Sequence, residues 1–341
     1  MLSIIQFPQI RLQESGYNLI IVLKHVQPQI YVFSEKSRRK SGEMLCTNIS
    51  ISHASAGLKK RKSTMKIITN TASSLTQSDG ERLGITVLPV SVSLGSSSMR
   101  DYIDITPDKF VELLHGDEMP VSSQPSVGDI MSAFENTEED TLMLTVADGL
   151  SGEYMTAMGV RNSLDRKEHI HIINSRSLAG PLRYMAVRAA QLRDEGISPQ
   201  EILDRIRSCA GSNVSFVIPA DFNYLKKSGR INNMTSMIGG ALHLLPVLTQ
   251  SEDHKRISFM TIRRTWKTAV ATIISSLKSI GVDSKYLITV AYAEDRDLAC
   301  RVMKQIRESF PETQTEILQL APSLITHGGP GCIVVQTVHT V

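Results

Sequence analysis

The sequence is poor in cysteine, and its four cysteines, Cys46, Cys209, Cys300 and Cys332, are at least 32 positions apart. This spacing excludes a C-x-x-C metal or redox motif and gives no framework for a small disulfide-bonded fold. Long apolar runs are also missing: the longest near the start, residues 19–23, has five residues, whereas a membrane span needs about 18. The start also lacks the short apolar stretch and small cleavage-site residues of a secretory signal. We therefore expect a cytoplasmic protein with free thiols and no transmembrane segment.

Basic residues are concentrated at the start of the chain. Residues 1–64 hold ten of the 37 lysines and arginines and three of the 34 acidic residues, which leaves 27 basic and 31 acidic residues in 65–341. The rest of the chain therefore offers no obvious basic face for nucleic acid. Residues 1–64 show no sustained period, and three interpretations stay open: a flexible basic tail, a targeting segment, or translated sequence upstream of a true start at Met65. The last is favoured because Met65 leads directly into a clear strand.

After residue 64, short β-branched runs alternate with amphipathic helical patterns. Strands are expected at residues 66–69, 85–94, 141–147, 170–174, 214–219, 256–261, 286–293, 315–320 and 332–338. The clearest helical patterns are at residues 181–193, 199–209, 265–279 and 295–309. This alternation predicts an α/β architecture. The segment from Cys209 to Val214 is the best candidate for a boundary, which gives two α/β domains at 65–212 and 213–341 after a poorly structured basic extension.

The strong nucleotide and hydrolase motifs are absent. There is no G-x-x-x-x-G-K-[ST], and residues 328–331 (Gly-Gly-Pro-Gly) do not match G-x-G-x-x-G. Residues 149–153 fail the G-x-S-x-G pattern because the second glycine comes one position early. His169 and His171 share a strand face, but no third ligand stands at metal-binding spacing, so we expect no metal.

Four segments are hard to explain as scaffold alone: residues 122–126 (Ser-Ser-Gln-Pro-Ser), 150–154 (Leu-Ser-Gly-Glu-Tyr), 224–231 (Tyr-Leu-Lys-Lys-Ser-Gly-Arg-Ile) and 327–331 (His-Gly-Gly-Pro-Gly). The Ser-Gly step at a strand–helix junction suits an anion, although helix capping alone also explains it. The arginine of the third segment is a preferred carboxylate ligand, or simple surface. The glycines of the fourth allow close approach of a ligand, or form a plain turn.

The order of these segments resembles the DegV family of bacterial fatty-acid-binding proteins, over essentially all of residues 65–341. Residues 67–72 (Ile-Ile-Thr-Asn-Thr-Ala), 174–175 (Asn-Ser) and 245–248 (Leu-Pro-Val-Leu) add to the resemblance. It implies two α/β domains that hold one long-chain fatty acid, with the carboxylate in the cleft between them and the acyl chain in a buried tunnel. It also implies a partner, an ATP-dependent fatty acid kinase that converts the carboxylate to an acyl phosphate for phospholipid synthesis. The protein itself would be a carrier with no catalytic residues and no cofactor.

The resemblance also assigns the ligand site. The hydroxyls of the family's T-S-x-P-S motif correspond to Ser122 and Ser123, and the serine and glycine of its L-S-G-T motif correspond to Ser151 and Gly152. The family's cleft Arg and His residues correspond to Arg230, Arg263 and His327. Several positions depart from the family's pattern: Ser122 replaces the usual threonine but keeps the hydroxyl, and Thr71 stands at the serine of T-D-S-x-x-D. Asn70 and Ser74 stand where T-D-S-x-x-D has carboxylates, and Glu153 replaces a threonine. A carboxylate at position 153 would repel a bound carboxylate unless it points away.

A fatty acid also needs a dry tunnel. Burying roughly fourteen methylenes at about 0.8 kcal/mol each is worth on the order of 11 kcal/mol before association costs, so the tail would dominate affinity. Methionine fills irregular apolar space, and the expected lining, which could equally be ordinary core, is Met155, Met158, Met234, Met237, Ile238, Leu242, Leu244 and Leu245.

Two other functions stay open. Ser151 and His327 could serve as nucleophile and base of a hydrolase or acyl transferase, with glycines 328, 329 and 331 as an oxyanion site. No acidic residue stands out to orient His327, however. The same polar groups could also bind a small phosphorylated ligand.

Overall fold

The structure is a computed structural model that describes residues 9–14, 17–22, 31–34, 65–114, 118–135, 139–221, 224, 229–230 and 244–341. These residues fall into two compact units, 1–59 and 60–341. In the first unit, three short strands form an antiparallel sheet in the order β1 (Gln9–Glu14), β2 (Tyr17–Val22) and β3 (Tyr31–Ser34). The other residues of the extension lie outside the described part of the chain.

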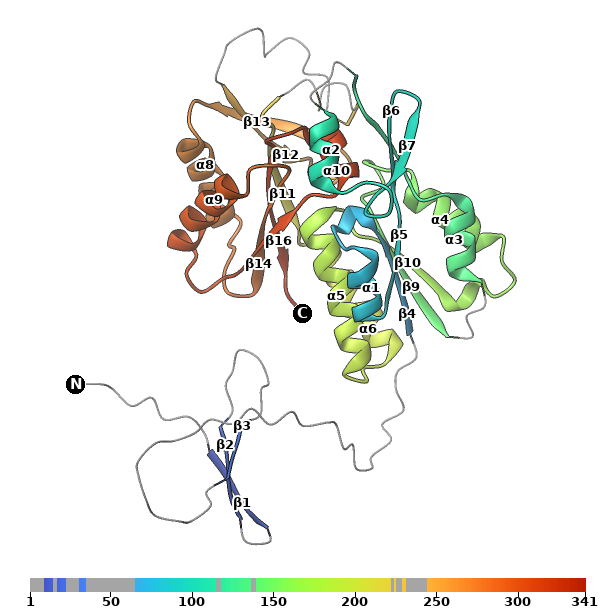
Figure 1. Cartoon of the computed structure of the whole chain (residues 1–341), viewed down its shortest axis with the longest axis vertical. Coiled ribbons are helices and arrows are strands. Elements are labelled where there is room, and N and C mark those ends of the chain that lie inside the picture. Colours follow the sequence, from blue (N-terminus) through green and yellow to red (C-terminus); the bar gives the residue numbers. More distant parts are fainter. Residues whose placement is uncertain are drawn as a thin grey trace, which may run out of the picture. The chain divides into compact units, whose positions relative to one another are not determined.

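The second unit begins with a four-stranded parallel sheet (Figure 1). Its strands run in the order β10 (Ile170–Asn174), β9 (Asp140–Thr145), β4 (Met65–Asn70) and β5 (Ile85–Leu88). Successive side chains point to opposite faces of this sheet, and helices cover both faces. One face packs on α1 (Gln77–Leu83), α5 (Ala179–Asp194) and α6 (Pro199–Ala210), and the other on α3 (Val127–Phe134) and α4 (Glu153–Asn162).

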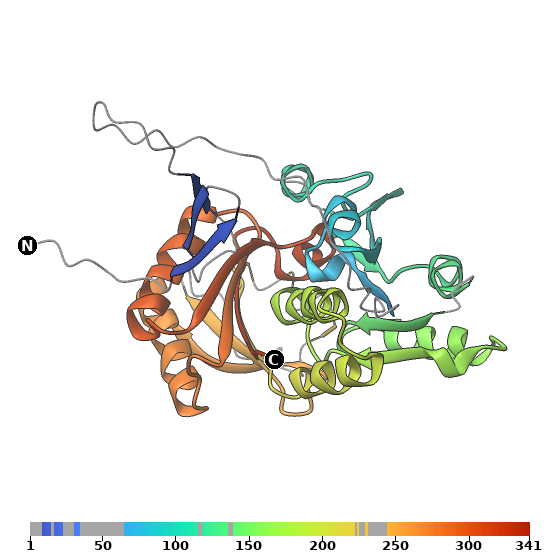
Figure 2. The ribbon, with the colours of Figure 1, turned by 90° about the horizontal axis from the view of Figure 1, so that it is seen from below.

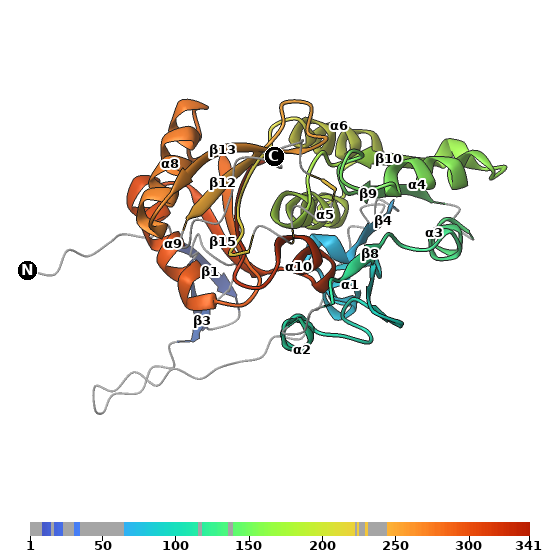
Figure 3. The ribbon, with the colours of Figure 1, turned by 90° about the horizontal axis from the view of Figure 1, so that it is seen from above.

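A six-stranded mixed sheet follows. Its order is β13 (Ile257–Arg263), β12 (Leu245–Gln250), β11 (Val214–Ile218), β16 (Ile333–His339), β14 (Tyr286–Tyr292) and β15 (Gln314–Gln319). One face, with Phe216 and Val335, packs on α8 (Trp266–Ser279) and α9 (Arg296–Ser309). The opposite face meets α5 and α10 (Pro322–Gly328). Figures 2 and 3 show α5 between the two sheets, where Leu182 shares one core with Leu287 and Val338.

The expected α/β class is confirmed, and one predicted strand proves to be two. Residues 85–94 divide into β5 and β6 (Ser91–Leu94) because Pro89 lacks the N–H that a continuous strand would use. The strand β6 belongs to a third, small sheet with β7 (Ser97–Arg100) and β8 (Val121–Ser123). Beside it lies α2 (Pro107–Leu113), in which Thr106 is the N-cap and Pro107 is the first helical residue.

The four-stranded sheet comes from residues before position 212 and the six-stranded sheet from residues after it. Residues 60–341 nevertheless form one compact unit, so the division into two domains stays a prediction. Among the helices of the described residues, none has the length and apolar character needed to span a bilayer.

Candidate functional site

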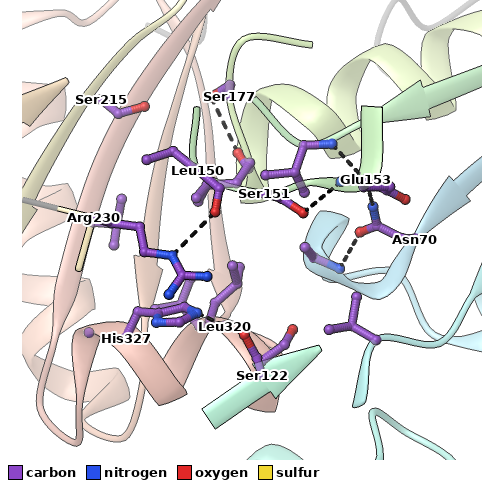
Figure 4. A pocket seen from close by; sticks show the side chains of 18 of the residues that line it. Asn70, Ser122, Leu150, Ser151, Glu153, Ser177, Ser215, Arg230, Leu320 and His327 are labelled. Carbon is purple, nitrogen blue, oxygen red and sulfur yellow. Dashed lines mark hydrogen bonds between the residues drawn. The ribbon is translucent and has the colours of Figure 1, made fainter. Parts of the chain in front are cut away.

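A cavity of about 270 Å³ lies on the face of the six-stranded sheet that is turned away from α8 and α9 (Figure 4). Most of its lining surface is apolar. The apolar lining comes from Ala72, Val90, Pro125, Val146, Leu150, Leu178, Val217, Ile257, Leu320, Leu324, Cys332 and Val334. The polar lining comes from Asn70, Ser122, Gln124, Ser151, Glu153, Ser177, Ser215, Arg230, Gln250, Ser323, His327 and Gln336. The cavity therefore combines an apolar interior with discrete polar groups, as small-molecule sites do.

Two of the predicted residues meet at one end of this cavity. Ser122 on β8 and His327 on α10 are 205 positions apart in sequence, and Ser122 Oγ lies 2.8 Å from His327 Nε2. Burial, together with the positive charge of Arg230, lowers the pKa of His327 to about 4. The imidazole is therefore neutral at physiological pH. Its Nδ1 is buried and has no partner among the described residues.

The predicted Ser-Gly step opens α4, with Gly152 as the residue before the first helical turn. Ser151 N–H donates to the carbonyl oxygen of Ala147 (3.1 Å), and Glu153 N–H donates to Ser151 Oγ (3.2 Å). These two amides are thus occupied within the protein and do not offer free N–H groups to an anion. The Ser151 hydroxyl accepts in this contact and keeps its proton for another partner.

Arg230 also lines the cavity. Its Nε donates to the carbonyl oxygen of Leu150 (3.4 Å), and its own carbonyl oxygen accepts from Ile257 N–H (3.0 Å). These contacts tie the arginine both to the loop before α4 and to β13. Figure 4 shows its guanidinium next to His327. The site consequently carries a cation beside a neutral histidine and two serine hydroxyls.

Two predicted ligand residues are not brought to the cavity. Ser123 follows Ser122 on β8, and because neighbouring side chains of a strand point to opposite faces, it is exposed. Arg263 at the end of β13 donates instead to Thr272 Oγ1 (3.0 Å), to the carbonyl oxygen of Ile262 (2.8 Å) and to Thr261 Oγ1.

The expected methionine lining is not what the described residues show. Met234, Met237, Ile238 and Leu242 lie outside the described part of the chain. Met158, Leu244 and Leu245 are described but do not line the cavity, and Met155 faces solvent with 68% of its side chain exposed. Among the described residues the apolar lining comes mainly from valines and leucines of the six-stranded sheet, α10 and the connecting loops.

Glu153 is a cavity residue that sequence reasoning did not assign to ligand binding. Its carboxyl is fully buried, and its Oε2 accepts from Asn70 Nδ2 (2.6 Å) and from Val146 N–H (3.1 Å). Burial raises the pKa of Glu153 to about 7, although both hydrogen bonds oppose this shift. Its Oε1 has no partner among the described residues. The departures at positions 70 and 153 were visible in sequence, but their contact was not.

The chemistry of a Ser-His-acid triad is not assembled in the described residues. His327 faces Ser122 rather than Ser151, and no carboxylate accepts from its Nδ1. The described residues also contain no group of three or more His, Cys, Asp or Glu side chains placed to hold a metal. The arrangement suits binding of an anion with an apolar body.

Comparisons with known proteins identify the family and the fold. The sequence profile described as "Uncharacterised protein, DegV family" matches residues 64–340. A DegV domain-containing protein of Staphylococcus aureus (strain N315) is 28% identical over 271 residues, covering 78% of this chain and 96% of that protein. Among solved structures, a fatty-acid-binding DegV family protein of Thermus thermophilus superimposes with a TM-score of 0.73 at 23% identity, over 81% of this chain and 99% of that one. A stearic acid-binding protein of Eubacterium ventriosum gives a TM-score of 0.72 at 20% identity, over 81% and 98%.

Proposed function

Because this chain belongs to the DegV family, we propose that it binds one long-chain fatty acid in the cavity, with the carboxylate at the Ser122–His327 end and the acyl chain along the apolar wall. The observation that carries the proposal is the combination of an arginine, two serine hydroxyls and a mainly apolar interior in one cavity. Solved structures of the same fold are described as a fatty-acid-binding and a stearic acid-binding protein.

The head site would work by hydrogen bonds and one positive charge. Arg230 is the only cation among the described lining residues, and an arginine–carboxylate contact is charge-assisted. The hydroxyls of Ser122 and Ser151 would donate to the carboxylate oxygens. For Ser122 this requires His327 to carry its proton on Nε2 and donate to Ser122 Oγ, which frees the serine proton for the ligand.

Glu153 does not oppose this ligand as a fixed negative charge would. Its Oε2 is held by Asn70 and the Val146 amide, and its raised pKa keeps a large share of the carboxyl protonated near neutral pH. Both the hydrogen bonds to Oε2 and the protonation of the carboxyl would reduce its repulsion of a carboxylate ligand, which supports the proposal.

The acyl chain would supply most of the affinity, because burial of methylenes is worth about 0.8 kcal/mol each. We place this carrier in the cytoplasm and propose that it presents the acid to an ATP-dependent fatty acid kinase, which forms an acyl phosphate for phospholipid synthesis. Family resemblance supports this step. It is tested by mixing the loaded protein, ATP and such a kinase and trapping the acyl phosphate with hydroxylamine.

The binding proposal is tested by native mass spectrometry of the protein purified from a bacterial host, followed by organic extraction. We expect a bound long-chain fatty acid that is lost when Ser122 and Ser151 are both replaced by alanine. Ser123→Ala is the matched control, since this neighbouring serine is exposed and lies outside the cavity.

Each other outcome identifies a different function. Protein that carries no lipid and takes up neither palmitate nor oleate contradicts the proposal. A phosphorylated compound in the extract would support the small-anion alternative. Hydrolysis of generic esters that is abolished by Ser122→Ala would support an enzyme.

A further inference from the structure

A row of polar side chains crosses the sheet face that lines the cavity. Ser215 on β11 is the registered partner of Gln336 on β16. On its other side, the pairing of Phe216 with Thr249 places Ser215 opposite Gln250 on β12. All three polar side chains line the cavity. An apolar tunnel does not need such a row.

Both atoms of the Gln336 side-chain amide make hydrogen bonds within the protein. Gln336 Oε1 accepts from Gly180 N–H (3.1 Å), and its Nε2 donates to Ser215 Oγ (2.9 Å) and to the carbonyl oxygen of Leu178 (3.1 Å). It therefore joins the start of α5 to the sheet. Because Ser215 Oγ accepts in this contact, its own proton is directed elsewhere.

In Gln250, only the nitrogen of the side-chain amide has hydrogen-bond partners among the described residues. Gln250 Nε2 donates to the carbonyl oxygens of Arg176 (2.7 Å) and His254 (3.0 Å), which fixes the amide. Its Oε1 is buried and has no partner among the described residues, and only 9% of the residue is exposed. The cavity wall thus holds one hydroxyl donor and one amide acceptor on neighbouring strands.

Ser215 lies away from the Ser122–His327 end of the cavity, and Gln250 stands opposite it on the neighbouring strand. Figure 4 shows Ser215 and Ser177 on the opposite side of the cavity from Ser122 and His327. A saturated chain that reached this wall would leave the acceptor of Gln250 buried without a hydrogen bond, which is unfavourable. A hydroxyl would satisfy both groups, since it can donate to Gln250 Oε1 and accept from the Ser215 hydroxyl.

We propose that Ser215 and Gln250 form a second polar subsite that accepts a hydroxyl group on the distal half of the acyl chain, so that this protein prefers hydroxylated long-chain fatty acids. The inference rests on the proposed function and specifies its ligand. It requires no chemical step, only recognition.

The test is calorimetric titration of delipidated protein with octadecanoic acid and with monohydroxy-octadecanoic acids whose hydroxyl is moved along the distal half of the chain. We expect at least one positional isomer to bind roughly three- to tenfold more tightly than the unsubstituted acid, which corresponds to one good hydrogen bond. Gln250→Leu should abolish or reverse this preference. Gln314→Leu, the same change at an exposed site of the edge strand β15, should leave it intact.

Gln250 also donates to two backbone carbonyl oxygens, so its replacement could disturb folding. A second variant separates that effect from the loss of the subsite. Ser215→Ala keeps those contacts and should reduce the preference by itself. Equal binding of all isomers and the unsubstituted acid overturns the subsite alone. A preference that survives both Gln250→Leu and Ser215→Ala also overturns it, and binding of no fatty acid at all overturns the proposed function together with the subsite.

Discussion

Asn70 and Glu153, which lie 83 positions apart in the sequence, form a buried hydrogen bond of 2.6 Å between the side-chain amide and Oε2 of the carboxyl. Both positions depart from the DegV pattern, in which an aspartate stands at the first and a threonine at the second. In the family's pattern the carboxyl group of this pair stands at the end of β4, whereas in this chain it stands at the start of α4. The two positions that depart are therefore in direct contact, and we expect their contributions to stability to be coupled.

A double-mutant cycle tests this coupling. Asn70→Asp would place two carboxyl groups in contact and should destabilise the protein by about 2 kcal/mol or more at pH 7.5. Asn70→Asp combined with Glu153→Thr should recover most of that loss, because one carboxyl and one hydroxyl then remain. Urea unfolding of the four proteins measures the coupling, and simple additivity of the two single changes would contradict it.

The pH dependence of stability follows from the same carboxyl. In the unfolded chain Glu153 has its ordinary pKa of 4.5, whereas burial raises the pKa to about 7 in the folded protein. Between pH 4.5 and pH 7 the folded state holds a proton that the unfolded state has lost. The contribution of Glu153 to the free energy of unfolding is therefore complete below about pH 4.5 and is lost as the pH rises through 7.

Glu153→Gln should therefore flatten the fall in unfolding free energy between pH 4.5 and pH 7.5 by on the order of 3 kcal/mol. Asp101, whose pKa burial also raises to about 7, contributes with the same sign and will leave part of the slope. Urea unfolding at several pH values measures the difference. A slope unchanged by Glu153→Gln would show that the folded carboxyl ionises at an ordinary pH.

The histidine of the head site should stay neutral well into the acidic range. Burial and Arg230 together lower the pKa of His327 to about 4. We expect its ring nitrogen chemical shifts in NMR spectra to stay those of a neutral imidazole at pH 6 and to titrate near pH 4. Arg230→Met should raise this pKa, because a nearby positive charge is removed. A titration near pH 6.5 in the unaltered protein would contradict the buried placement.

Much of the fold could be predicted from sequence, because β-branched runs and helical periods depend on local residues. The candidate site was harder to predict from the sequence than the fold. Its predicted serine Ser123 was misplaced because the short strand β8 was not anticipated, and strand alternation sends it outward. Ser215 and Gln336 lie on mainly apolar strands far apart in the sequence, and only the order of the strands brings them together. Likewise, α10 was not predicted, because the sequence analysis singled out only its last two residues, His327 and Gly328, with the glycines that follow.

The glycines after His327 are explained by backbone conformation and close packing. Gly329 has a φ of +76°, and a Cβ there would lie 2.6 Å from the ring of Tyr224. Gly329→Ala should thus cost about 1–3 kcal/mol of stability and shift the loop that follows His327. Gly211→Ala is the matched control, since Gly211 has a φ of −94° and no atom within 4 Å of an added Cβ. Thermal unfolding and fatty acid titration of both variants measure the effect: the control should retain stability and binding, whereas equal behaviour of the two variants would show that residues 329 and 224 are not in close contact.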